Sequence, residues 1–283
     1  MSTGTLGAGP PPQTGIRSRI GAVRYMNTTP LIEGLQKLAD VDLRLAPPAE
    51  LIGMLERDEV DLALASIVDV HRAATPVAIV PVGMIGCDGE TRTVRLVSRV
   101  PIERISTVHA DIESHTSVVL ARMIVAFARK GAPPEVVEWD ASGPAPWPES
   151  AVVIGDKVND PRVGGYPHAV DLGEAWKART GLPFVYAAWM CRADRLDDPR
   201  VRAGAMVLDR QRRHNAMRTD WIVARQAERH GWTAGDAAEY LGRLLRYDVS
   251  PAHRAAVERF FAEASSLGLM RAVRPVTWAD DLG

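Results

Sequence analysis

The spacing of hydrophobic positions changes repeatedly along the first part of the chain, and this predicts an α/β fold. Short alternating or continuous apolar runs predict strands, whereas apolar residues at every third or fourth position predict helices. The predicted order is strand 19–23, a helix from 29, strand 41–46, helix 48–60 and strand 60–67. Strands separated by helices pair in parallel through right-handed crossovers, so a parallel sheet is expected here.

The middle of the chain mixes strands with one long helix. Strands are predicted at 76–86, 91–98, 105–111, 135–139, 150–156 and 180–192, with a helix over 114–131. A Pro-rich loop, "DASGPAPWPES", stands where a helix of some length could otherwise join two of these strands. The remainder is mainly helical, and the predicted helices cover 201–217, 219–231, 233–247 and 250–270.

This order predicts two lobes joined by two crossing strands. Residues 17–98 and 190–283 would form the first lobe, including the C-terminal helices, and residues 99–189 would form an inserted second lobe. Residues 1–16 are rich in Gly, Pro, Ser and Thr and are predicted to form a disordered tail. Ligands of such folds bind in the crevice at the carboxyl ends of the strands.

Composition narrows the class of protein. The chain has 283 residues, 46% of them hydrophobic, and a net charge of −1, which gives no support for binding to nucleic acid or a membrane surface. The N-terminus lacks the basic and apolar regions of a secretory signal, and no run of about 18 apolar residues predicts a membrane span. We therefore expect a cytoplasmic protein, and its oligomeric state stays open.

Polar side chains gather where predicted strands end or helices begin. Four clusters stand out: Asn27-Thr28-Thr29, Ser66, Asp88-Gly89 with Thr93, and Ser114-His115-Thr116-Ser117. Such residues at a helix start often do no more than cap the helix. Brought together from two lobes, their hydroxyls and the unpaired N–H groups of helix N-termini would suit a small anionic ligand. The hydroxyls and the lack of an acidic cluster argue against a metal site.

Some charged residues have two interpretations each. His115 titrates near neutrality and either faces the cleft or simply begins a helix. Asp156, in "IGD", follows a strand and is either a ligand contact or a turn residue. Three arginines in or beside predicted strands either neutralise ligand carboxylates or face solvent: Arg24, Arg92 and Arg95.

Beyond these patterns, the chain resembles a known family over almost its whole length. The segments "RIGAVRYMNTTPL", "VDLALASI", "CDGETRTVRLVSRVPIERI", "SHTSVVLAR", "VIGD" and "DLGEAWKARTGLPFVYAAWMCR" occur in this order. From about Arg19 to Met270 the chain resembles the chorismate dehydratases of the futalosine route to menaquinone. The resemblance implies a two-lobed, type-II periplasmic-binding-protein-like fold without secretion. It also implies dehydration of chorismate to 3-[(1-carboxyvinyl)oxy]benzoate.

The resemblance further implies roles for individual residues. The family's key asparagine corresponds to Asn27, and its key serine corresponds to Thr93, which keeps a hydroxyl. The family's usual arginine in "S-R-T-S" is His115 here. We therefore predict Asn27 and Thr93 as catalytic residues, with chorismate as the small-molecule partner and no metal or cofactor. The predicted substrate-binding residues are Thr28, Ser66, Asp88, Gly89, Ser114, His115, Thr116, Ser117 and Asp156.

Two other functions stay open from the sequence. The same fold serves solute-binding proteins and ligand sensors, and fold alone does not separate them from enzymes. The missing secretory signal counts against an exported receptor, and the lack of an appended DNA-binding segment counts against a transcriptional sensor. The sister enzyme of the pathway, which makes dihydroxynaphthoate, is a further alternative. "YMNTTPL" and "TGLPFVYAAW" look more like the dehydratase than this sister enzyme.

Overall fold

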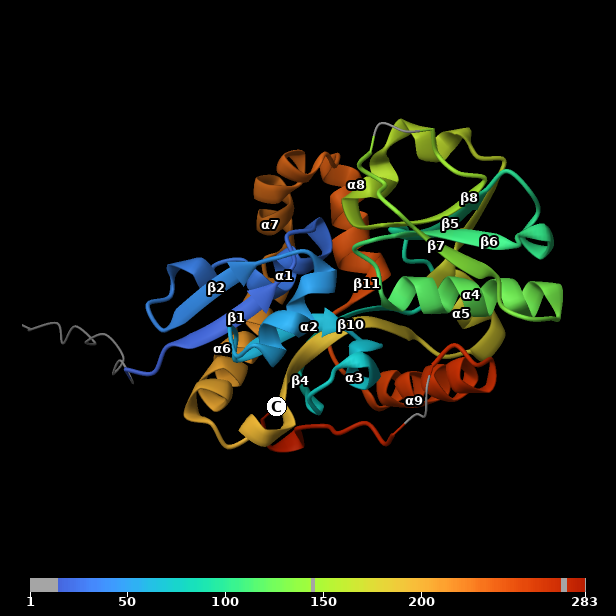
Figure 1. Ribbon diagram of the computed structural model, residues 1–283. Helices are drawn as coiled ribbons and strands as arrows, with labels where there is room; N and C mark the ends of the chain where they lie inside the picture. The colour runs from blue at the N-terminus through green and yellow to red at the C-terminus, as the bar shows by residue number, and fades with distance from the viewer. Residues whose placement is uncertain (1–14, 144–145, 271–273, 283) are drawn as a thin grey trace, which may run out of the picture.

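Two β-sheets organise the chain in the computed structural model, which describes residues 15–143, 146–270 and 274–282 (Figure 1). Most of the tail expected over 1–16 lies outside the described residues. The six-stranded sheet has the order β11-β4-β10-β3-β1-β2, and we call the part around it the first lobe. Its strands are β1 (Ser18–Ala22), β2 (Val41–Leu45), β3 (Leu62–Ser66), β4 (Val77–Cys87), β10 (Phe184–Arg192) and β11 (Leu245–Arg246).

The five-stranded sheet forms the second lobe and has the order β7-β6-β8-β5-β9. Its strands are β5 (Val94–Ser98), β6 (Thr107–Asp111), β7 (Glu135–Trp139), β8 (Ser150–Ile154) and β9 (His168–Asp171). The helices are α1 (Thr29–Ile32), α2 (Pro48–Glu56), α3 (Asp69–Arg72), α4 (Thr116–Arg129), α5 (Leu172–Thr180), α6 (Pro199–Ala216), α7 (Thr219–Gln226), α8 (Ala234–Glu239) and α9 (Pro251–Ser266).

The parallel pairing expected near the N-terminus is present. Strand β1 pairs in parallel with both β2 and β3, and Ile20 lies opposite Leu43 on one side and Leu62 on the other. Every residue of β3 is buried. A strand covered on both faces is apolar throughout, which explains why "LALAS" lacks a clear alternation of polar positions.

Two strands pair in a different sheet from the one that the expected lobe boundaries imply. Strand β5 pairs with β8 and β9 in the five-stranded sheet, although 17–98 was assigned to the first lobe. Strand β10 pairs with β3 and β4 in the six-stranded sheet from Phe184 onward, although 99–189 was assigned to the second lobe. The apolar pattern does not change where a chain passes from one sheet to another, so periodicity could not locate these crossings.

The structure also contains elements that the sequence pattern missed. Helix α5 and strand β9 fill the segment before β10, and Asp171 caps α5 by accepting hydrogen bonds from the N–H groups of Gly173 and Glu174. The helix predicted over 233–247 is interrupted, because α8 is followed by a π-helical turn, Tyr240–Leu244, and by β11. Leu245 pairs with Cys87 at the sheet edge, so tertiary pairing overrides helical periodicity there.

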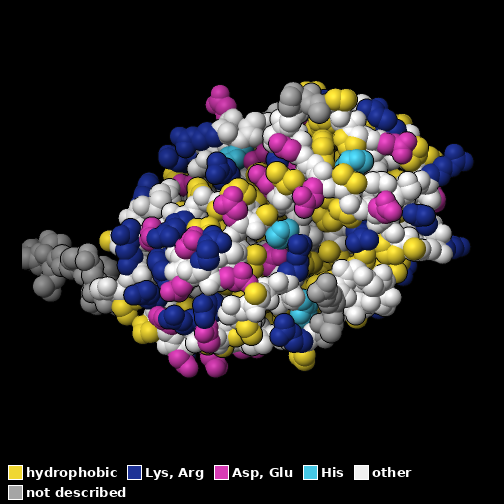
Figure 2. All heavy atoms as spheres, in the orientation of Figure 1, with side chains coloured by type: hydrophobic (Ala, Val, Ile, Leu, Met, Phe, Trp, Pro, Cys, Tyr) yellow, Lys and Arg dark blue, Asp and Glu magenta, His cyan; other side chains and the backbone are white. Residues whose placement is uncertain are grey.

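Surface charge follows the near-neutral composition. Figure 2 shows basic and acidic side chains interspersed over the face that it displays, without a large field of one sign. Among the described residues, no helix is both long and apolar enough to cross a membrane.

Figure 1 shows α4 in the second lobe, with its N-terminal end directed toward the first lobe.

Candidate functional site

A pocket lies between the two lobes, and its volume is about 620 Å³ when the open solvent at its mouth is included. It is lined by residues from the ends of β1, β3 and β8, the start of α4, and the turn after α8. Seven predicted site residues line it together: Asn27, Ser66, Thr93, Ser114, His115, Thr116 and Ser117. The polar clusters that are distant in sequence therefore converge on one cavity.

Asn27 and Thr93 occupy the same wall and share a neighbour, Tyr240. The hydroxyls of Thr93 and Tyr240 are 2.5 Å apart, and both side chains are buried. Burial raises the pKa of Tyr240, so its phenol stays neutral. Thr28 does not line the pocket, but its hydroxyl donates to Oδ1 of Asn27 at 3.2 Å. The Asn27 side chain also interacts with the Tyr240 phenol, and this contact lowers the pKa of the phenol by less than burial raises it.

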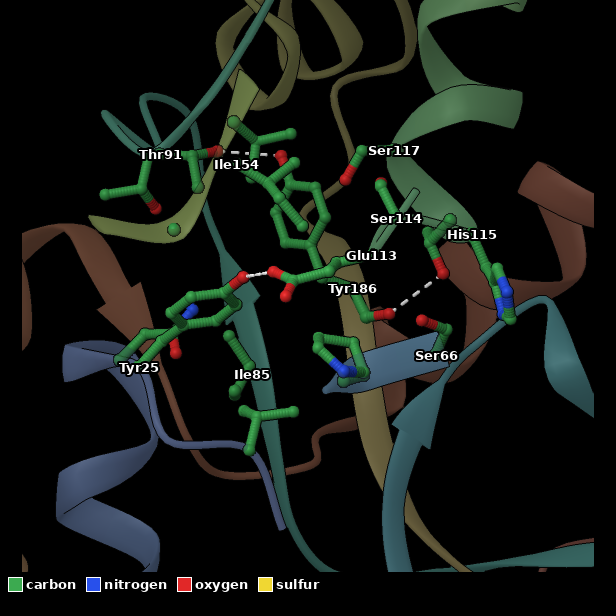
Figure 3. Close-up of a pocket in the computed structure, with 18 of the residues that line it drawn as sticks. Tyr25, Ser66, Ile85, Thr91, Glu113, Ser114, His115, Ser117, Ile154 and Tyr186 are labelled. Carbon is green, nitrogen blue, oxygen red and sulfur yellow. Dashed lines mark hydrogen bonds between the residues drawn. The ribbon is translucent and has the colours of Figure 1, made fainter. Parts of the chain in front are cut away.

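The N-terminus of α4 presents hydroxyls and backbone N–H groups to the pocket. Ser114 and Ser117 line the cavity at this end of the helix (Figure 3). The hydroxyl of Thr116 instead donates to the backbone carbonyl of Tyr186 at 3.0 Å and thereby ties α4 to β10. Ser114, Ser117 and the first N–H groups of α4 are the donors best placed for an anion.

His115 makes a contact between the lobes. Its Nδ1 lies 2.8 Å from Oδ1 of Asp69, a fully buried residue at the start of α3. In Figure 3 the His115 ring points away from Tyr25 and Glu113. The imidazole therefore joins α4 to α3 at one side of the pocket.

Glu113 is a charged residue of the pocket lining that the sequence analysis missed. The hydroxyl of Tyr25 donates to the carboxylate of Glu113, and Figure 3 shows the two side chains directed at each other across the lobes. Lys157 lies 2.9 Å from both Glu113 and the buried Asp111. Burial lowers the pKa of Lys157, but its hydrogen bonds with the two carboxylates outweigh burial, and the net pKa is raised. Lys157 is therefore a cation that partly neutralises this wall.

The pocket lining has little formal charge of its own. Among the described residues that line it, Glu113 carries the only carboxylate, and none is Arg or Lys. Its apolar walls include Val23, Leu64, Ile85 and Ile154. An anion in this pocket would consequently be held by hydroxyls and N–H groups. Among the described residues, no cluster of three or more His, Cys, Asp or Glu side chains is arranged to hold a metal ion.

Three other predicted binding residues lie outside the pocket lining. Asp88 pairs with Lys177 at 2.5 Å on the surface. Gly89 follows in the same turn with φ of +126°, a conformation that favours glycine. Asp156 is directed to other parts of the protein and accepts hydrogen bonds from the first lobe and the C-terminal helices. Each of these residues follows a predicted strand, and this position was the only reason to expect them near the ligand.

The "DLGEAW" segment supports the pocket wall from behind. Asp171 accepts hydrogen bonds from the N–H groups of Thr91 at 3.0 Å and Arg92 at 2.6 Å, in addition to capping α5. The hydroxyl of Thr91, which lines the pocket, lies 2.8 Å from that of Tyr186. A Cβ at Gly173 would come within 2.5 Å of the carbonyl oxygen of Gly89 and 2.6 Å of Sγ of Cys87. Only glycine fits between α5 and this turn.

The sequence profile of a family described as menaquinone biosynthesis matches residues 18–266. The chain belongs to this menaquinone-biosynthesis family. Among the curated relatives is the chorismate dehydratase of Thermus thermophilus, which is 28% identical over 266 residues and is matched over 88% of this chain and 95% of its own. The family predicted from the sequence motifs is confirmed, and these matches support an enzyme of menaquinone biosynthesis.

Solved structures similar to this family member confirm its periplasmic-binding-protein-like fold. The alkanesulfonate-binding protein SsuA of Xanthomonas axonopodis, bound to MOPS, has a TM-score of 0.64 and 12% identity, with 90% of this chain and 94% of that chain covered. The periplasmic aliphatic sulphonate binding protein SsuA of Escherichia coli has a TM-score of 0.63 and 12% identity, with coverages of 94% and 97%. At such low identity these neighbours establish the fold alone.

Proposed function

We propose that the protein is a chorismate dehydratase, a hydro-lyase that converts chorismate to 3-[(1-carboxyvinyl)oxy]benzoate and water. The supporting observation is the convergence of Asn27, Thr93 and the α4 N-terminus on one interlobe pocket. These residues belong to motifs that resemble the dehydratase family, and the relative from Thermus thermophilus carries that name.

The pocket suits a ring that bears two carboxylates and a hydroxyl. The N–H groups at the start of α4, with Ser114 and Ser117, would bind one carboxylate. The apolar walls would pack against the cyclohexadiene ring, and Asn27 and Thr93 would meet its polar substituents. Recognition by hydrogen bonds from both lobes would couple binding to closure, which excludes water and holds back competing reactions of chorismate.

The reaction requires orientation of the substrate more than it requires a strongly acidic or basic catalytic residue. Loss of the C3 hydrogen and the C4 hydroxyl makes the ring aromatic, so the driving force is large. The enolpyruvyl carboxylate of the substrate takes the C3 proton, and the departing C4 hydroxyl takes up a proton and leaves as water. Asn27 and Thr93 hold the enolpyruvyl side chain or the departing hydroxyl in the reacting geometry by hydrogen bonding.

Glu113 is the rival candidate for the base, because its carboxylate is the only one among the described lining residues. Its oxygens already accept a hydrogen bond from Tyr25 and face the ammonium group of Lys157. Both contacts hold the carboxylate toward Tyr25 and Lys157, so its oxygens are already occupied by these two partners. This arrangement favours the substrate's own carboxylate as the base. Retention of most of the kcat in Glu113→Gln would support that assignment.

The test of the proposed function is turnover of chorismate by the purified protein. Chromatography with mass detection should show chorismate disappearing and one aromatic acid, lighter by one water, appearing in equal amount. Unchanged chorismate in the presence of folded protein would contradict the proposal. Calorimetry with chorismate would then decide whether the chain is a non-catalytic binding protein of the same fold. A cytoplasmic location is consistent with the proposed role as a biosynthetic enzyme.

A further inference from the structure

The Asp156 carboxylate accepts three hydrogen bonds from residues outside its own lobe. It belongs to the short helical segment Gly155–Asn159 that follows β8 in the second lobe. Its Oδ2 accepts from the N–H of Met26 at 3.2 Å and lies 2.9 Å from Nδ1 of His230, and its Oδ1 accepts from Nε1 of Trp232 at 2.9 Å. A carboxylate has about four lone-pair sites, so most of its accepting capacity is used at this junction.

Two of these donors connect directly to the predicted catalytic residues. Met26 precedes Asn27, so the bond to its N–H fixes the backbone that carries the Asn27 amide. Trp232 stacks in parallel on Tyr240, with ring centroids 4.8 Å apart and an angle of 2° between the planes. Tyr240 in turn contacts the hydroxyl of Thr93. The Asp156 carboxylate is therefore linked to Asn27 through Met26 and to Thr93 through Trp232 and Tyr240.

The backbone around Asp156 is fitted to this contact. Gly155 has φ of +60°, and a Cβ at this position would lie 3.0 Å from the ring of Tyr25. Glycine thus allows the second-lobe segment to approach the Tyr25–Asn27 segment closely. The approach brings the Asp156 carboxylate beside Met26 without placing Asp156 in the pocket lining.

We propose that Asp156 is a positioning residue that sets Asn27 and Thr93 in register with each other when the lobes close. This inference rests on the proposed function and adds to it a link between closure and assembly of the site. Asp156 touches no substrate; it acts through the Met26 N–H on Asn27 and through Trp232 and Tyr240 on Thr93. An Asn27 amide displaced by a fraction of an ångström would still bind chorismate but would orient it poorly.

The experiment compares Asp156→Asn, Trp232→Phe and a control, Asp160→Asn, by steady-state kinetics with chorismate. Asparagine keeps the size of the side chain but removes the charge and one acceptor, and phenylalanine keeps an aromatic ring beside Tyr240 without the N–H donor. Asp160 directly follows this segment of the second lobe, and among the described residues its side chain pairs only with Arg162. We expect kcat to fall about 10- to 100-fold in Asp156→Asn, with KM within about threefold of wild type. We expect a smaller fall in Trp232→Phe and no change in Asp160→Asn.

Pairing with Asn27→Ala separates positioning from a general loss of structure. Because part of the effect passes through Asn27 and part through Thr93, adding Asp156→Asn to Asn27→Ala should lower kcat by clearly less than Asp156→Asn lowers it in the wild type. A full additional loss in the double variant, or wild-type kcat in Asp156→Asn, would overturn the inference. An unchanged melting temperature in the single variant is part of the expected result, and a fall in kcat matched by unfolding would also overturn it. Failure of wild type to convert chorismate would contradict the proposed function instead, so the two failures are distinguishable.

Discussion

The hydroxyl of Thr93, next to the first strand of the second lobe, lies 2.5 Å from the hydroxyl of Tyr240, in the turn that follows α8. The two residues are 147 positions apart in the chain. Because burial keeps the phenol of Tyr240 neutral, one of the two hydroxyls must donate to the other. This hydrogen bond therefore orients the Thr93 hydroxyl and limits the directions in which it can bond to a ligand.

Substitution of Thr93 tests whether that hydroxyl takes part in the reaction. Thr93→Ser keeps the hydroxyl and should keep most of the kcat, whereas Thr93→Val keeps the shape and removes it. We expect Thr93→Val to lose about 100-fold in kcat, the cost typical of removing one oriented donor. The measurement is kcat with chorismate for both variants. Equal rates in the two would show that the hydroxyl has no role.

Gly173 provides a test of how the pocket wall is supported. Gly173→Ala should lower the free energy of unfolding by about 2 kcal/mol, because its Cβ would press on the backbone of Gly89 and on Cys87. Gly235→Ala is the matched control, since open space surrounds that exposed helical position. It should stabilise by about 0.5 kcal/mol through helix propensity. Urea denaturation of both variants measures this, and equal stabilities would refute the tight fit.

Much of the fold could be predicted because burial imposes a period on the sequence. Strands β1 to β3 and helices α4, α6 and α9 have long apolar patterns and were predicted within a few residues. Helix α5 was missed because its short "LGEAWKART" sequence has few apolar residues to show a helical period. The passage of β5 into the second sheet was missed because strand pairing partners leave no periodic signal of their own.

The site was predicted where a motif lies on one short segment and missed where it depends on distant contacts. The clusters around Asn27 and Ser114 were visible because polar residues at strand ends and helix starts stand out locally. Tyr240 lies in a segment, 233–247, that the sequence pattern predicted only as a helix, and its contact with Thr93 depends on tertiary structure. Glu113 adjoins the predicted cluster, but its pairing with Lys157 could not be inferred from spacing.

Lys157 should matter more for stability than an exposed lysine of similar geometry. Lys157→Met leaves Glu113 and the buried Asp111 without their cation and should cost about 3 kcal/mol of unfolding free energy. Lys177→Met breaks the exposed pair with Asp88 and should cost less than about 1 kcal/mol. Denaturant midpoints at neutral pH give both values. A loss for Lys157→Met no larger than for Lys177→Met would contradict the role assigned to the network.

Two histidines predict a loss of stability in mild acid. Burial lowers the pKa of His71 and of His253 below the ordinary value of 6.5, so the folded protein disfavours their protonated forms. As pH falls below 6.5, the unfolded chain binds more protons at these positions than the folded chain, and the free energy of unfolding decreases. We expect urea midpoints to fall between pH 7.5 and 5.5, and to fall less in a variant with both His71→Gln and His253→Gln. The same decline in that variant would rule out these histidines as its source.

Asn27 is expected to act at the reacting centre of a chorismate-dehydrating pocket. The most direct measurement is the rate of aromatic product formation by wild type and Asn27→Ala under saturating chorismate, with melting temperatures recorded for both. We predict rapid turnover by wild type, and loss of about 100-fold or more in kcat for Asn27→Ala at an unchanged melting temperature. A wild-type rate in Asn27→Ala would contradict the claim.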